Sequence, residues 1–179
     1  MSWECRSFAD LDDFHQAITA IFSQWQQDCF LDSPAAHPSI SVCSRGARHL
    51  GDWWTAQVLT PLALSQIFIP ITPPDIPLPE EWSAPPQIAH PCLPYGPVLP
   101  LRVPSLVGQA HVAYRQGLGH FLIQPQVQGL RRYPDAEAVF AAWDQVIAFR
   151  RRTREQLEKG QQEDRRAFLR RLILAPEKR

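Results

Sequence analysis

The stretch WWTAQVLTPLALSQIFIPI, residues 53–71, decides the fold. Its two halves, Trp53–Thr60 and Ser65–Ile71, are rich in the β-branched and aromatic residues that are typical of strands. Thr60 and Pro61 interrupt the run, and a proline nitrogen cannot donate a hydrogen bond to a neighbouring strand. The stretch therefore predicts two strands around a proline-marked bend.

Further strands are predicted on both sides of this pair. Upstream, Ser39–Val42 alternates polar and apolar residues, and a glycine-bounded turn, Arg45–Gly51, follows it. Downstream, Leu106–Tyr114 and Leu118–Ile123 flank the segment Arg115–Gly117, a combination that is typical of a hairpin. Together these segments indicate a central antiparallel sheet of four or five strands.

Helices are predicted near both ends of the chain. Asp10 is a suitable N-cap for a first helix, because apolar residues then recur at three- and four-residue spacing. Pro134, in the first turn, opens a second helix over residues 136–147, and a further tail helix is predicted after Gly160. The class is therefore α+β, with the sheet packed by an N-terminal and a C-terminal helix. The first apolar stripe comprises Leu11, Phe14, Ile18, Ile21, Phe22 and Trp25.

Proline and charge divide the chain into regions. Residues 70–104 hold 12 prolines, so we expect an extended proline-rich loop there. The formal net charge is zero, but residues 150–179 carry 11 Lys+Arg against 5 Asp+Glu, whereas residues 1–149 carry 7 against 13. We therefore predict an α+β domain, residues 1–149, followed by a basic helical tail, residues 150–179.

The residues that carry chemistry form no recognisable site. The histidines lack the HxH or HExxH spacing of metal sites, and Ser44 and Ser105 lack the glycine-flanked elbow of hydrolases. The cysteines are too far apart to form the close pairs of zinc or redox motifs, so reduced thiols are expected, although Cys43 and Cys92 could meet in the fold. We predict no catalytic residue, no metal, no cofactor and no enzymatic activity. The cysteines are Cys5, Cys29, Cys43 and Cys92, and the histidines are His15, His37, His49, His90, His111 and His120.

The sequence also bears on location and on nucleic acid. Apolar runs such as Ile67–Ile71 are far shorter than the roughly 20 residues of a membrane span. Met1–Asp13 lacks the basic start and cleavage site of a signal peptide, which favours a cytoplasmic location. In the basic tail, the basic residues alternate with glutamates and no series of aromatic residues interleaves to stack on bases. A helix that is solvated or faces a protein partner is therefore favoured over nucleic-acid binding.

Aromatic residues and prolines are the unusual feature of the chain. Trp53, Trp54, Trp82 and Tyr95 lie near or within proline-rich segments, and aromatics on stiff backbone suit a protein-binding face. The alternative is that Trp53 and Trp54 belong to the core and that the prolines merely cover a sheet.

A series of short motifs resembles the HybE family of nickel-iron hydrogenase assembly chaperones. The motifs occur in the family's order, although none is specific alone. They are His37–Val42, Gly51–Trp54, Val58–Leu62, Ile67–Pro70, Leu93–Gly96, Phe121–Pro125, the helix Ala138–Ile147 and Arg165–Arg170.

The resemblance implies a non-catalytic chaperone that binds a hydrogenase precursor in the cytoplasm until cofactor insertion and subunit assembly are complete, and until export where the hydrogenase is exported. We expect the client surface to combine a sheet face near the tryptophans, the Leu93–Gly96 loop and the tail segment Arg165–Leu169. A structural subunit of a larger complex and a nucleic-acid-binding module are the alternatives. The expected client contacts are Trp53, Trp54, Thr60, Pro61, Leu93, Pro94, Tyr95, Gly96, Arg165, Arg166, Phe168 and Leu169.

Overall fold

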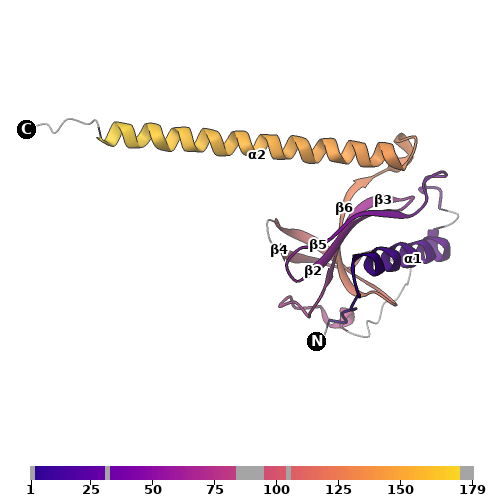
Figure 1. Cartoon of the computed structure of the whole chain (residues 1–179). Coiled ribbons are helices and arrows are strands. Elements are labelled where there is room, and N and C mark those ends of the chain that lie inside the picture. Colours follow the sequence, from indigo (N-terminus) through magenta and orange to yellow (C-terminus); the bar gives the residue numbers. More distant parts are fainter. Residues whose placement is uncertain (1–2, 31–32, 84–94, 104–105, 174–179) are drawn as a thin grey trace, which may run out of the picture. The chain divides into compact units, whose positions relative to one another are not determined.

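The computed structural model describes residues 3–30, 33–83, 95–103 and 106–173 (Figure 1). For residues 106–107 and 160–173 it describes the backbone only. The chain forms two compact units, Met1–Val139 and Phe140–Arg179. In chain order the elements are α1 (Leu11–Phe30), β1 (Cys43–His49), β2 (Trp53–Leu59), β3 (Ala63–Pro70), β4 (Val98–Val103), β5 (Leu106–Arg115), β6 (Gly119–Gln128) and α2 (Ala136–Ile173).

The strands form one antiparallel sheet in the order β1-β2-β3-β6-β5-β4. The predicted α+β class is confirmed, and so are the proline-marked bend and the β5–β6 hairpin. At the bend, Leu59 pairs with Leu64, and the hydroxyl of Thr60 accepts hydrogen bonds from the backbone N–H groups of Leu62 and Ala63 at 3.3 and 3.2 Å. The Thr60 hydroxyl thus gives two backbone N–H groups of the turn a hydrogen-bond acceptor.

The described sheet has six strands, not the four or five that the sequence predicts, because β4 forms inside the predicted proline-rich loop. Val98–Val103 pairs only with β5, so it is an edge strand. An edge strand tolerates Pro100, since one side of its backbone needs no ladder hydrogen bond. Residues 84–94 of the predicted loop lie outside the described residues.

The first strand begins later than predicted. Cys43–His49 pairs with β2, although the alternating pattern is centred on Ser39–Val42. The register shifts between Arg45 and Arg48, and Gly46 has a φ of 67°. The glycine therefore marks a bulge within the strand, not the turn after it.

The first helix has the predicted cap and buried face. The backbone N–H of Asp13 donates to the Asp10 carboxylate at 2.8 Å, while the Asp13 carboxylate accepts from the N–H of Ala9 at 2.9 Å. This reciprocal arrangement satisfies two N–H groups at the helix start. Phe14, Ile18 and Phe22 are buried, which confirms this part of the predicted stripe, whereas Leu11 at its start is exposed.

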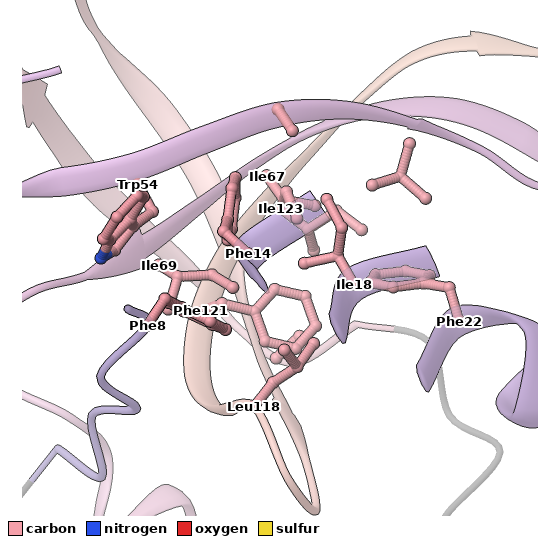
Figure 2. Close-up of a cluster of buried hydrophobic side chains, with 13 residues drawn as sticks. Phe8, Phe14, Ile18, Phe22, Trp54, Ile67, Ile69, Leu118, Phe121 and Ile123 are labelled. Atoms are coloured by element: carbon pink, nitrogen blue, oxygen red, sulfur yellow. The ribbon is translucent and has the colours of Figure 1, made fainter. Parts of the chain in front are cut away.

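One face of the sheet and α1 enclose an aromatic core (Figure 2). Alternate side chains of β2 point into it, since successive residues of a strand face opposite sides. Trp54 lies 5.4 Å from Phe14 and 5.6 Å from Phe8, measured between ring centroids. The cluster also contains Ile18, Phe22, Ala56, Val58, Ile67, Ile69, Ala113, Leu118, Phe121 and Ile123.

The opposite face carries a second core. Trp53, the neighbour of Trp54, points into it and meets the Trp3 ring edge-on at 6.3 Å. Leu78 covers it from the segment after β3, and the buried side of β4 completes it. Because both faces are covered, β2 and β3 are apolar along most of their length.

His120 joins the N-terminal segment to the sheet. Its Nδ1 accepts a hydrogen bond from the backbone N–H of Glu4 at 2.8 Å, so its Nε2 carries the proton and donates to the carbonyl of Trp82 at 2.7 Å. Burial lowers the pKa of His120, although the hydrogen bond to Trp82 and the charge of Glu4 oppose the shift. The ring is therefore held in one neutral form.

We expect the free energy of unfolding to fall as the pH drops below the ordinary histidine pKa of 6.5, because the unfolded chain then binds a proton that buried His120 resists. Above that pH both states are neutral and the contribution is complete. Urea unfolding between about pH 7 and pH 5.5 measures the slope. His120→Gln should flatten it, whereas His49→Gln, at an exposed position, should not. An unchanged slope in His120→Gln would contradict this assignment.

The last helix is longer than predicted. Ala136–Ile173 is one continuous α-helix, so the expected separate helix after Gly160 is wrong. A glycine inside a helix costs only about 1 kcal/mol relative to alanine, which a long helix tolerates. Asp135 caps the start, accepting from the N–H of Ala138 at 2.8 Å. The division between residues 149 and 150 stays a prediction.

Candidate functional site

The two tryptophans expected on the client surface are core residues. Trp53 and Trp54 are each 6% exposed and lie on opposite faces of the sheet. Their burial supports the alternative that the sequence left open. Neither side chain offers a contact area to a partner in this structure.

Thr60 and Pro61 are also buried, at the turn between β2 and β3. The carbonyl of Pro61 accepts a hydrogen bond from the backbone N–H of His37 at 2.9 Å, which ties the entry to β1 onto this turn. Pro61 and His37 line one pocket of about 530 Å³, and Thr60 lines another. Thr60 and Pro61 therefore line the pockets and also shape the turn that borders them.

Tyr95 and Gly96 precede β4. The Tyr95 ring is half-buried and stacks on His111 at 5.3 Å. Gly96 donates its N–H to the carbonyl of Val112 at 2.7 Å and lies so close to the Trp82 indole that a side chain at residue 96 would overlap it. Leu93 and Pro94 lie outside the described residues, so their expected role stays a prediction.

Thr60 and Tyr95 meet at a pocket of about 230 Å³. The C-terminal half of α1 forms one wall, and the β2–β3 turn and β6 form the others. The pocket thus brings together two of the expected contacts with residues that the sequence did not single out. The lining residues are Phe22, Trp25, Phe30, Val58, Thr60, Leu62, Ala63, Ser65, Tyr95, Ile123 and Gln128.

Trp25 is the functional candidate that sequence reasoning missed. Its ring meets Phe22 and Phe30 edge-on at 5.8 and 5.1 Å, and the guanidinium of Arg115 lies 3.9 Å above it. The indole Nε1–H is buried and has no hydrogen-bond partner within the part of the chain that the structure describes. The sequence places Trp25 at the end of an apolar stripe, where it resembles any other core residue.

Burial sets the electrostatics around this pocket. It lowers the pKa of Arg115 to about 10, partly opposed by the Tyr95 phenol, so Arg115 stays charged at neutral pH. It raises the pKa of Tyr95, although a hydrogen bond from Ser65 and the charge of Arg115 oppose the shift. Tyr95 is therefore neutral at the pocket wall.

The expected contacts in the tail all lie on α2. Arg165, Arg166, Phe168 and Leu169 have helical backbone, and only the backbone is described there. They belong to the second compact unit, whereas Thr60 and Tyr95 belong to the first. Upstream on α2, Phe149 and Leu157 are each 64% exposed.

The cysteines differ in part from the expectation of reduced thiols. Cys29, in the last turn of α1, is disulfide-bonded, whereas Cys5 and Cys43 are free. Sequence spacing excludes only local cysteine motifs and does not test pairing across the fold, which is why the expectation fails. Among the described residues, no group of three or more His, Cys, Asp or Glu side chains could hold a metal ion.

No described helix combines the length and the apolar composition needed to cross a membrane. The fold and the pocket together define a small α+β protein with an apolar, uncharged cavity at one end of its core.

The family follows from residues 13–171, which match the model of "[NiFe]-hydrogenase assembly, chaperone, HybE". The chain belongs to this family, and its function is to assist [NiFe]-hydrogenase assembly. The resemblance stated from the sequence is thus confirmed. The solution structure of HybE from Escherichia coli is similar, with 20% sequence identity and a TM-score of 0.47 over 69% of this chain and 67% of that chain. A comparison with curated proteins finds no match.

Proposed function

We propose that this chaperone binds the precursor of a [NiFe]-hydrogenase subunit in the cytoplasm and holds it until cofactor insertion and assembly are complete. The family match over residues 13–171 is the observation that carries this proposal. The protein acts by binding alone, without catalysing a reaction. Where the hydrogenase is exported, the bound precursor waits for export.

The client surface has two parts in this proposal. One part is the pocket with Thr60 and Tyr95, together with Gly96 and the segment Leu93–Pro94 before it. The other is the segment of α2 that contains Arg165, Arg166, Phe168 and Leu169. Arginine side chains form bidentate pairs with carboxylates, so this region suits acidic segments of a client. Trp53 and Trp54 support the surface from within, because both are buried.

Affinity capture of the tagged protein from its native cells, with mass spectrometry of the bound polypeptides, tests this function. We expect an immature hydrogenase subunit in a transient complex. Recovery of nucleic acid, or of a permanent complex without a hydrogenase polypeptide, would overturn the proposal in favour of a nucleic-acid-binding module or a structural subunit. Two experiments identify the nucleic-acid-binding alternative. Binding to nucleic acid should weaken steeply with salt and disappear when residues 150–179 are deleted.

A triple substitution, Tyr95→Ala with Arg165→Ala and Arg166→Ala, should weaken capture of the precursor by about tenfold or more, since aromatic and arginine residues dominate interface energetics. Circular dichroism should show an intact fold. The matched control is Arg151→Ala with Arg152→Ala, at exposed positions of the same helix. Equal affinity of the triple variant and the wild type would remove these three residues from the client surface.

A further inference from the structure

The pocket at the end of α1 selects an uncharged occupant. Among the described residues that form its wall there is no Asp, Glu, Lys or Arg, and Tyr95, an ionisable residue in it, is neutral at physiological pH. Phe22, Val58 and Ile123 form an apolar wall and are almost fully buried. An ion placed against this apolar wall would lose its hydration, which is unfavourable.

Its size indicates a side chain rather than a free cofactor. Pockets for drug-sized ligands and cofactors usually measure about 300–1,000 Å³. The pocket here, at about 230 Å³, is smaller and suits one large apolar side chain.

Trp25, which lines this cavity, carries a buried hydrogen-bond donor. Its indole is fixed by Phe22 and Phe30 on its edges and by Arg115 above its ring, yet its buried Nε1–H has no acceptor among the described residues. A buried donor without a partner destabilises the protein, so an acceptor supplied by a ligand would stabilise the complex. In a polypeptide, the uncharged acceptor nearest to an apolar side chain is a backbone carbonyl.

We infer that the pocket holds one large apolar side chain of an extended client segment, and that an adjacent backbone carbonyl of that segment accepts the hydrogen bond from Trp25. The inference rests on the proposed function, because the segment belongs to the hydrogenase precursor. It names Phe22, Trp25 and Ser65 as client-binding residues beside Thr60 and Tyr95.

A titration of the full-length, ¹⁵N-labelled protein with N-acetyl-phenylalanine amide tests the pocket without a client. The indole N–H signal of Trp25, assigned by its loss in Trp25→Phe, should move downfield and saturate. N-acetyl-aspartate amide should leave it unchanged. Ala63→Leu, which fills the cavity from its wall, should abolish the response. The inference would be overturned if the wild-type signal did not respond to the phenylalanine probe. It would also be overturned if Leu93→Ser shifted that signal without any probe, because the chain's own segment would then occupy the pocket.

Capture of the precursor tests the role of the pocket in client binding. We expect Ala63→Leu to weaken capture about tenfold and Trp25→Phe, which keeps an aromatic ring but loses the donor, to weaken it several-fold. Gln16→Ala, at an exposed position of the same helix, should bind like the wild type. Urea unfolding establishes that each variant is folded. Undiminished capture by both pocket variants would overturn the inference. Failure of the wild type to capture any hydrogenase polypeptide would instead overturn the proposed function, and the titration alone would then test the pocket.

Discussion

Replacing Trp54 with alanine should lower the free energy of unfolding by about 3–5 kcal/mol, the range found when a buried aromatic side chain is truncated. The indole is 6% exposed and packs against the rings of Phe8 and Phe14, so its removal leaves a cavity between α1 and the sheet. Urea denaturation followed by circular dichroism measures the loss. A change of this size is a large part of the roughly 5–15 kcal/mol that stabilises a typical domain.

Phe149→Ala is the matched control for this prediction. Phe149 is 64% exposed on α2, so its truncation should change stability by less than about 0.5 kcal/mol. Comparing Trp54→Ala with Phe149→Ala distinguishes the loss of a core side chain from the loss of a surface side chain. If Trp54→Ala unfolds like the wild type but no longer captures the precursor, Trp54 is a client contact, as the sequence suggested, and the core assignment fails.

The tryptophan pair shows how far the sequence predicts this fold. Strand periodicity requires Trp53 and Trp54 to face opposite sides of the sheet, so each face carries one indole. Trp3 and Leu78 cover the second face, and they come from segments before α1 and after β3. This coverage depends on contacts between segments that are far apart in the sequence, and strand periodicity does not predict such contacts.

Strand β4 illustrates a second limit. The prolines over residues 70–104 predict that neither a helix nor a central strand runs far, but Pro100 is compatible with an edge strand. Whether a strand lies at an edge is a property of the assembled sheet. The sequence therefore predicts the antiparallel class and misses one strand.

The pocket combines four separate parts of the chain: the end of α1, residues 58–65, Tyr95 and β6. Thr60 and Tyr95 are identifiable from the sequence because a Thr-Pro step and an aromatic after prolines are unusual. Trp25 is not, since its apolar spacing is that of any core-facing helical residue. The unsatisfied indole donor exists only once α1 is packed against Arg115 of β5.

Gly119→Ala should destabilise the protein by about 3 kcal/mol and release the N-terminal segment from the sheet. Gly119 has a φ of 73°, which costs an alanine about 1–2 kcal/mol. Its Cβ would also overlap the backbone carbonyl of Glu4, where His120 donates its N–H at 2.8 Å and Cys5 pairs with Gly119. Backbone cannot move aside as a side-chain end can, so an overpacking cost of roughly 1–3 kcal/mol is added. Urea unfolding and hydrogen exchange of the Glu4 amide measure the two effects.

Gly129→Ala is the control for Gly119→Ala, because it introduces a similar backbone strain without a contact to the N-terminal segment. Gly129 has a φ of 66°, close to that of Gly119, but an added Cβ there meets no atom within 4 Å. Gly129→Ala should therefore cost only the conformational term, about 1–2 kcal/mol, and leave the exchange of the Glu4 amide unchanged. If the two variants lose equal stability and both retain a protected Glu4 amide, the N-terminal segment does not hold the close approach to Gly119. In that event the neutral form of His120 would also lack its structural cause, because the hydrogen bond from Glu4 to Nδ1 depends on the same approach.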